Sequence, residues 1–446
     1  MIIIQRYGCQ RRLRRRSRLL LTGAVSGGNS MSSTVGDNVG RLRRLRGLTQ
    51  EQLAEAAGLA VETIQKLEQN KPGSPRMSTL RAIASALAVP TSALVGPAVA
   101  GLAAGPGSDD DKIALGLLRR ALTPARGLSG MTVGHVSVSP PTVDGLQRSI
   151  AEIDRIYHGD DYASALARLP VLIGAARSLV DASSGDQRTT SAGQLAQAYQ
   201  IAGTTLIQLR SFDLAHHALN LALDVADESG NELVAASVVT TMCWMLLRQG
   251  RFDEAEQLAV ATADAVEPRF SRADPTRLAV WGWLMLRGSA AAIRDGRADD
   301  AGEMLDAASA AAARIGEQLP ADVALRMPVT MGAFCAVTVE MKRVEMSVVA
   351  GDPVTALALA ERVPPGSGRA TSDNRNRHQL DRAWANAERG DLVEATRILS
   401  GLRAKSPTWL RHQRYAGDIV TTILTRRRRP VSQELAALAD LLGAGS

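Results

Sequence analysis

The segment from Thr49 to Glu68 constrains the fold of this chain more than any other stretch of its sequence. Thr49 is a good helix cap, and Gln52 three residues later completes a capping box. Gly58 stands where the chain must turn sharply, with a positive φ that glycine adopts at little cost. Small or apolar residues occupy the positions where two helices would face each other: Ala54, Ile64 and Leu67. The segment therefore predicts two short helices that cross at a tight turn.

Further amphipathic segments flank this pair of helices. Val35, Val39 and Leu42 recur at helical spacing before it. After it, residues 78–87 are amphipathic, and a short helix is expected after Pro90. Basic residues crowd the first of these helices: Arg41, Arg43, Arg44 and Arg46. Five short helices are thus expected between residues 31 and 95.

This arrangement resembles the lambda-repressor-like, or xenobiotic-response-element, family of transcriptional regulators. The resemblance covers residues 31–95 only. It rests on the spacing of the small residue, the turn glycine and the apolar residues, together with the helix cap and the flanking helices. It implies an all-α, five-helix domain whose second and third helices form the motif that binds double-stranded DNA.

The resemblance also implies roles for single positions. Gln50, at the start of the second helix, matches a residue that contacts a DNA phosphate, with the backbone amides of that helix end assisting. Arg43 and Glu68 match a pair that bridges the first and third helices, so both are interpreted as structural. Arg44 and Lys71 are expected to add contacts to DNA. The positions that face the major groove are matched by Val61, Glu62, Gln65 and Lys66.

The chemistry of the third helix suits the reading of base edges. Glu62 can accept a hydrogen bond from a cytosine amino group, Gln65 can pair with adenine, and Lys66 can donate to guanine. One position departs from the family pattern, because Ala60 stands where serine is frequent. The third helix thereby loses a side-chain cap worth about 0.5–2 kcal/mol.

The net charge of +7 is concentrated at the start of the chain. Residues 1–30 contain seven arginines and no acidic residue, so residues 31–446 are neutral overall. We expect residues 1–30 to be either a disordered basic arm or sequence upstream of a true start at Met31. An export signal is disfavoured, because the apolar stretch that begins at Leu19 is only about seven residues long. The predicted DNA binding therefore does not depend on overall charge.

The chain divides by composition into further regions. Residues 96–145 are rich in glycine and proline and are interpreted mainly as a flexible linker, with one helix near Ile113 to Leu122. Residues 146–429 are predicted to form a helical repeat domain, and residues 430–446 a C-terminal tail. Aromatic residues make up only 3% of the chain, which favours close-packed helices over sheets.

An internal repeat marks the region beyond residue 146. An aromatic or apolar residue is followed three residues later by alanine at Tyr162/Ala165, Phe212/Ala215, Phe252/Ala255, Ala298/Ala301, Pro353/Ala356 and Leu392/Ala395. Successive alanines of these pairs lie 50, 40, 46, 55 and 39 residues apart, against about 34 for a minimal tetratricopeptide unit. The region resembles a tetratricopeptide-like α-solenoid with lengthened helices or loops, and an unrelated all-α bundle is the alternative.

A solenoid of this kind has a concave face for peptides, protein helices or small molecules, and a convex face for dimerisation. Trp244, Trp384 and Asn386 are candidates to line a ligand groove, although a tryptophan at helical spacing more often belongs to a core. The order of the parts is similar to peptide-responsive quorum-sensing regulators. That similarity implies a homodimer on a palindromic operator, with half-sites about 34–36 Å apart, and a peptide or small-molecule effector.

Signals for catalysis are absent from the sequence. It contains no phosphate-binding loop, no dinucleotide fingerprint, no paired zinc-binding histidine motif and no nucleophile elbow. Its three cysteines are scattered, which favours neither disulfides nor a metal cluster. We therefore expect neither an enzyme nor a cofactor or metal.

The expected compartment is the cytoplasm, in association with the nucleoid. No stretch reaches the roughly 18–20 apolar residues that span a membrane, and a DNA-binding role requires access to the chromosome. Two other functions compete with that of a regulator. They are a protein-interaction scaffold and an antitoxin-like module whose helical repeats clamp a partner protein.

Overall fold

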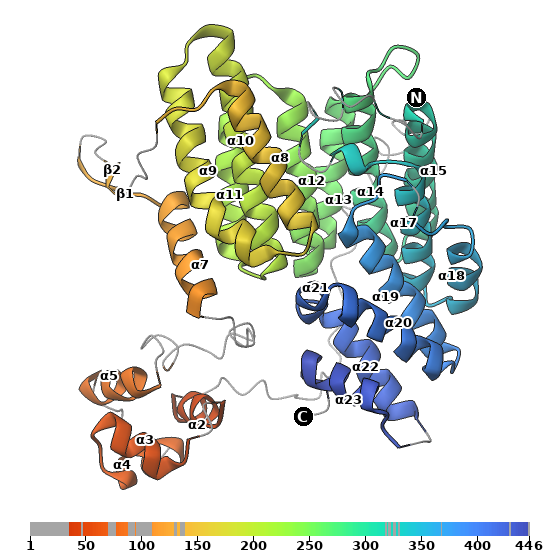
Figure 1. Cartoon of the computed structure of the whole chain (residues 1–446). Helices are drawn as coiled ribbons and strands as arrows, with labels where there is room; N and C mark the ends of the chain where they lie inside the picture. The colour runs from red at the N-terminus through yellow and green to blue at the C-terminus, as the bar shows by residue number, and fades with distance from the viewer. Residues whose placement is uncertain are drawn as a thin grey trace, which may run out of the picture. The chain divides into compact units, whose positions relative to one another are not determined.

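A computed structural model describes most of the chain as two units, Met1–Gly105 and Pro106–Ser446. It describes residues 35–45, 48–69, 77–87, 94, 109–128, 132–133, 139–316, 319, 323, 327–328, 331–366, 368–427 and 430–444. The arm predicted at residues 1–30, Lys71 and all but Leu94 of the predicted fifth helix lie outside these residues. Figure 1 shows the helices of each unit, coloured by position in the sequence.

The first unit is a cluster of short helices around a small apolar core (Figure 1). Its helices are α2 (Val35–Leu45), α3 (Gln50–Ala57), α4 (Val61–Glu68) and α5 (Met77–Ala86). α3 contacts both α4 and α5, and α2 contacts α4. The core residues with 4% exposure or less are Val39, Leu53, Ala54, Ile64, Leu80, Ile83, Ala84, Leu87 and Leu94.

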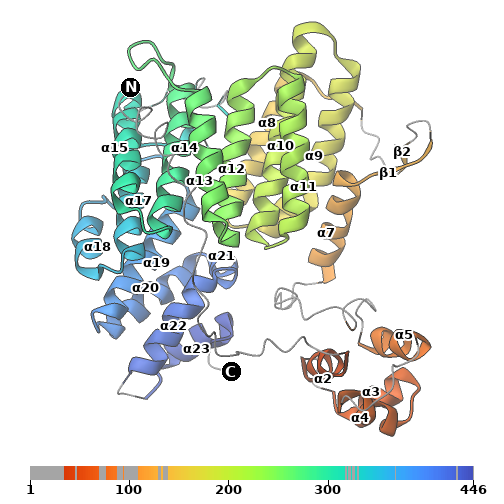
Figure 2. The ribbon, with the colours of Figure 1, turned by 180° about the vertical axis from the view of Figure 1, so that it is seen from behind.

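The second unit is built from longer helices that follow one another as antiparallel neighbours (Figure 2). Its elements are α7 (Asp109–Leu122), β1 (Ala125–Arg126), β2 (Thr132–Val133), α8 (Val143–His158), α9 (Tyr162–Ala182), α10 (Gly185–Gln208), α11 (Phe212–Glu228), α12 (Glu232–Gln249), α13 (Phe252–Ala265), α14 (Pro275–Arg294), α15 (Ala298–Ile315), η3 (Met331–Ala333), α17 (Ala336–Val349), α18 (Pro353–Ala360), α19 (Ser372–Glu388), α20 (Leu392–Lys405), α21 (Pro407–Arg411), α22 (Arg414–Arg426) and α23 (Gln433–Leu442). The two short strands pair antiparallel. The described residues are otherwise helical or irregular, in keeping with the all-α class predicted from the sequence.

Six helix pairs in this unit share one kind of turn. The pairs are α8/α9, α10/α11, α12/α13, α14/α15, α17/α18 and α19/α20. Two residues before each second helix, one residue has φ between 61° and 88°: Asp160, Arg210, Gly250, Gly296, Gly351 and Gly390. The next backbone N–H bonds back to a carbonyl five residues earlier, as Arg251 does to Leu246 at 3.0 Å. This is the Schellman arrangement, which satisfies the last carbonyls of the first helix.

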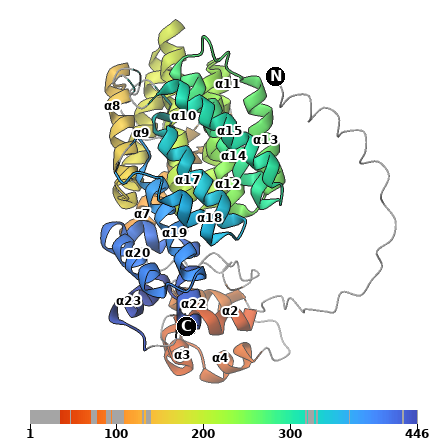
Figure 3. The same ribbon diagram turned by 90° about the vertical axis from the view of Figure 1, so that its right-hand side faces the viewer.

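The alanines singled out in the sequence lie on the inner side of these pairs. Each is 0–1% exposed: Ala165, Ala215, Ala255, Ala301, Ala356 and Ala395. Each stands three residues after the start of its second helix, where a larger side chain would hold the two helices apart. The first helix of each pair also contacts the first helix of the next pair, from α8 with α10 through to α17 with α19. In the same way, α19 contacts α22. Figure 3 shows the helices of the second unit in a view turned by 90° from that of Figure 1.

Part of the segment predicted as a linker belongs to the second unit. α7 begins at Asp109 and packs on α9. Leu118 and Leu122 of α7 are buried in the same apolar core as the buried residues of α9. Ala114, Leu118 and Leu122 stand four residues apart, so they form one apolar face along the helix. The unit therefore begins at Pro106 rather than at residue 146.

The predicted C-terminal tail likewise contains a packed helix. Ser432 caps α23, and its hydroxyl accepts a hydrogen bond from the backbone N–H of Leu435 at 3.2 Å. Leu435 and Leu438 are 5% and 0% exposed and join the main core. Apolar residues on one face of this short segment pack against α20, α21 and α22, so they are not solvated.

The end of the second unit packs back against its beginning. The hydroxyl of Ser372 at the start of α19 donates to the carbonyl of His158 at the end of α8, over 2.6 Å. Nearby, the rings of Tyr162 and His412 have centroids 6.4 Å apart. Leu380 and Trp409 are buried in the same core as Tyr162. These contacts join segments 214 residues apart in the sequence.

One helix of this unit is long and apolar enough to cross a membrane by length and composition. α9 has 21 residues, and 56% of its most apolar window is buried inside the protein. It carries Pro170 and contacts α7, α8 and α10. α9 is therefore interpreted as a core helix of the second unit.

Candidate nucleic-acid interface

The start of α3 has the capping geometry that the sequence predicts. The backbone N–H of Gln52 donates to the Thr49 hydroxyl at 3.2 Å, and the Thr49 N–H donates to the side-chain carbonyl of Gln52 at 2.8 Å. Thr49 itself is extended, with φ −77° and ψ 169°. Two amides that the helix leaves without partners are thereby satisfied, which fixes where α3 begins.

The turn between α3 and α4 is a Schellman motif centred on Gly58. Gly58 has φ 63° and ψ 35°, in the left-handed region where a side chain would be strained. Its N–H donates to the carbonyl of Glu55 at 3.1 Å, and the N–H of Leu59 donates to that of Ala54 at 2.9 Å. The turn sets the angle at which α4 leaves α3.

α4 presents different chemistry on its inner and outer faces. Ile64 is fully buried, and Leu67 is half-buried against the same core. Glu62 and Lys66 are exposed, and Gln65 is half-buried. Val61 is half-buried like Gln65, and it packs against the core. The polar side chains on the outer face of α4 are therefore Glu62, Gln65 and Lys66.

A hydrogen-bonded ion pair joins α2 to α4. The Arg43 guanidinium donates from Nε to Glu68 Oε1 at 2.7 Å and from Nη2 to Glu68 Oε2 at 2.9 Å. Nη1 donates to the carbonyl of Leu48 at 2.8 Å. The two side chains are only 12% and 9% exposed. The pair that the resemblance implied is thus present, and it also fixes the loop before α3.

Gln50 is a third member of this network. Its side-chain amide donates to Glu68 Oε2 at 2.8 Å, so Glu68 joins α2, α3 and α4. The sequence prediction placed Gln50 at a DNA phosphate and missed this bond, since a contact over 18 residues follows from the helix crossing rather than from local spacing. Gln50 still lies at the first position of α3, beside its N-terminal amides.

The network perturbs the ionisation of its members. The hydrogen bond from Arg43 lowers the pKa of Glu68, and the amide of Gln50 lowers it further, against a partial desolvation that raises it. The same bond raises the pKa of Arg43. Glu68 is thus held as a carboxylate at neutral pH, which keeps both of its oxygens available as acceptors.

Gly40 allows α2 to approach this network closely. A Cβ added at Gly40 would lie 3.3 Å from Glu68 Cδ and 3.5 Å from Glu68 Oε2. Gly40 is buried within α2, where glycine is otherwise unfavourable. Arg44, the residue after Arg43, is exposed, and its predicted contact with DNA stays a prediction.

Comparison with known proteins places this geometry in a family. The helix-turn-helix family matches residues 39–94. Residues 39–94 are a helix-turn-helix domain. An HTH-type transcriptional regulator of Bacillus subtilis, RghRB, itself uncharacterized, is 41% identical over 58 residues, which are 13% of this chain and 42% of that protein. The immunity repressor protein of Bacillus phage phi105 is 43% identical over 63 residues, 14% of this chain and 43% of that protein.

The family match covers residues 39–94, a small part of the chain. The chain spans less than half the length of either relative. The domain belongs to the xenobiotic-response-element type that the sequence predicts, and it supports a DNA-binding regulator.

The residues predicted to line a ligand groove in the second unit lie on two helices. Trp244 of α12 is half-buried against the main core, with the Arg248 guanidinium 5.4 Å from its ring centroid. Trp384 of α19 packs against two core clusters, and the Asn386 amide donates to the carbonyl of Arg382 at 2.9 Å. Neither of the cavities described below is lined by these three residues. Within the described parts of the chain, no three His, Cys, Asp or Glu side chains are placed to hold a metal.

Proposed function

We propose that this chain is a cytoplasmic, sequence-specific DNA-binding regulator of transcription that reads DNA through α4. The observation that carries the proposal is the polar outer face of α4, which is joined on its other side to α2 and α3 by the hydrogen bonds of Glu68. Glu62, Gln65 and Lys66 lie on the outer side of α4. On its inner side, Ile64 is buried in the core and Glu68 is hydrogen-bonded to α2 and α3. A fixed helix with hydrogen-bonding side chains on its outer face is what reading of the major groove requires. The proposal assigns no catalytic step to the chain.

The proposal gives the second unit the role of a tetratricopeptide-like body that supports a homodimer and senses an effector. What supports it is the recurrence of one turn geometry and one buried alanine in six helix pairs, together with contacts between successive first helices. Stacked helix pairs of this kind offer extended surfaces to peptides, small molecules or a second copy. Dimers with two-fold symmetry would place two copies of α4 on a palindromic operator.

The test replaces Gln65 and Lys66 with alanine in the full chain. Removal of each base contact should weaken specific binding by about 1–3 kcal/mol. Affinity for operator DNA is measured by gel shift at fixed salt, against genomic fragments retained by the wild-type protein. Ser85→Ala, at an exposed position of α5, is the matched control and should bind as the wild type does.

Two results would count against the proposal. If the double variant keeps the wild-type sequence preference, α4 is not the reading helix. If the wild-type protein binds DNA only weakly, at about 10⁻⁴–10⁻⁶ M and with strong salt dependence, the chain behaves as a scaffold rather than a regulator.

A further inference from the structure

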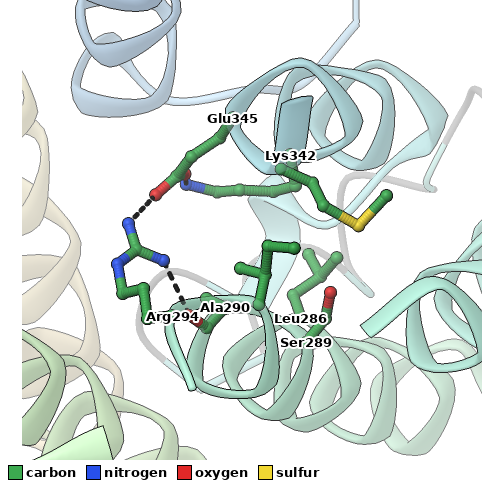
Figure 4. Close-up of a pocket in the computed structure, with 8 residues that line it drawn as sticks. Leu286, Ser289, Ala290, Arg294, Lys342 and Glu345 are labelled. Atoms are coloured by element: carbon green, nitrogen blue, oxygen red, sulfur yellow. Dashed lines mark hydrogen bonds and ion pairs between the residues drawn. The ribbon is translucent and has the colours of Figure 1, made fainter. Parts of the chain in front are cut away.

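Among the described residues of the second unit, two cavities differ greatly in capacity. One lies between α14 and α17 and is about 10 Å³, roughly the space of a single water molecule. Figure 4 shows why it is small: Arg294 reaches across it to Glu345, at 2.6 Å. Lys342 donates to the same carboxylate at 2.8 Å. This cavity is closed by its own ion pairs.

The other cavity is about 380 Å³ and lies between α17, α18, α19 and α20. Its size falls within the range of about 300–1,000 Å³ that is typical of small-molecule sites. Apolar side chains form much of its wall, among them Met341, Val363, Ile398 and Leu402. It opens beside the segment that follows the short helix α18, where Pro364, Pro365 and Gly366 form the edge.

The charged residues that line this cavity are all cationic. They are Arg375, Arg382, Arg397 and Lys405, and none of the described lining residues is an aspartate or glutamate. Arg397 is paired with Glu394 through two bonds of 2.6 Å, so its charge is largely balanced. Arg382 donates to the neutral side-chain oxygen of Gln379 at 3.0 Å, and Lys405 is exposed. A low-dielectric wall with an excess of positive charge attracts an anion.

His378 adds a polar group that lacks a partner. It lines the cavity, is 4% exposed, and its Nδ1 is buried with no hydrogen-bond partner in the part of the chain that the structure describes. Burial and the nearby charges of Arg382 and Lys342 lower its pKa to about 4, so the ring is neutral at pH 7. A buried nitrogen without a partner is destabilising, and a polar ligand or water in the cavity would offset that cost.

We propose that this cavity binds a small amphipathic organic anion. The guanidinium of Arg382 and the ammonium of Lys405 hold its charged group, because a guanidinium matches carboxylate and phosphate geometry in a bidentate manner. Its apolar part lies against Val363, Ile398 and Leu402. The proposal names the chemical class of effector that the second unit would sense. Any effect of this anion on DNA affinity rests on the effector-sensing role proposed above.

The experiment is calorimetric titration of the full chain with three probes of one shape. They are 2-naphthoate, 2-naphthyl phosphate and the neutral 2-naphthamide. One site per chain is expected for at least one of the anions, with the amide at least ten-fold weaker. The two anions distinguish a carboxylate ligand from a phosphate ligand.

Two variants locate the binding in this cavity. Arg382→Gln should weaken anion binding ten-fold or more, whereas Arg389→Gln, an exposed position of the same region outside the cavity, should not change it. Gly401→Leu should block binding by filling the space. A Cβ added at Gly401 would have no neighbour within 4 Å and the backbone there is helical, so a side chain can begin at this position without a clash at its Cβ. Gly401→Ala is its control and should leave binding intact.

Three results would overturn the site: neither anion binds, the amide binds as tightly as the anions, or Gly401→Leu binds as the wild type does. A gel shift with and without the bound anion then tests sensing separately. If the anion binds but DNA affinity is unchanged, the site stands and its role as the effector site fails.

Discussion

Glu68 is the residue through which three helices of the helix-turn-helix domain are joined. Its two oxygens accept from Arg43 on α2 and from Gln50 on α3, while its own backbone belongs to α4. A bidentate, largely buried pair of this kind is costly to break, because the remaining partner is left without its bond. The position of α4 therefore depends on one carboxylate.

Replacing Glu68 with glutamine should destabilise the domain by about 1.5–3 kcal/mol, the usual loss for hydrogen bonds to charged groups. Chemical unfolding followed by circular dichroism measures the change. Glu62→Gln, on the exposed face of the same helix, is the matched control and should alter stability by no more than about 0.5 kcal/mol. Equal losses for the two variants would contradict the network.

The same carboxylate makes the domain sensitive to acid. The folded-state pKa of Glu68 is lowered, so its contribution is fully present above its unfolded pKa of about 4.3 and is lost as pH falls through the folded value. The stability difference between the wild type and Glu68→Gln should therefore shrink as pH falls below about 4. A difference that stayed constant down to the lowest pH at which the domain folds would refute this assignment.

At the scale of elements, local chemistry and long-range packing were predictable to different degrees. The cap at Thr49, the turn at Gly58 and the six alanine positions follow from residues a few positions apart, so sequence patterns indicate them directly. The bond between Gln50 and Glu68, the half-burial of Val61 and the packing of α19 on α8 depend on how helices cross. The helix predicted near Ile113 to Leu122 is present as α7, but the glycines and prolines around it favoured a linker, so its packing on α9 was not predicted.

Two glycines of the second unit should respond oppositely to alanine. Gly390 turns the chain between α19 and α20 with φ 88°, where alanine is strained by about 1–2 kcal/mol. Gly401 lies within α20, where alanine should stabilise by about 0.5–1 kcal/mol because it restricts the unfolded chain. Neither added Cβ meets an atom within 4 Å, so backbone conformation alone separates them. Denaturant midpoints of the two variants that shift in the same direction would refute the turn assignment.

At the scale of the whole molecule, a small helix-turn-helix domain is joined in one chain to a large helical unit. The helix-turn-helix family matches residues 39–94, within the first of these. The second unit contributes the packed helix pairs, the fold-back of α19 on α8 and the cationic cavity. Because the proposed operator is palindromic, the protein on DNA should have twice the 47.2 kDa mass of one chain.

The central claim, that α4 reads DNA sequence, is tested most directly by sequencing the DNA that the purified full chain retains from a random pool. We predict one enriched motif with two inverted half-sites about 10–10.5 base pairs apart, or a multiple of that spacing. Alanine at Gln65 and Lys66 should change the preferred bases within each half-site. An unenriched pool, or the same motif from the variant and the wild type, would contradict the claim.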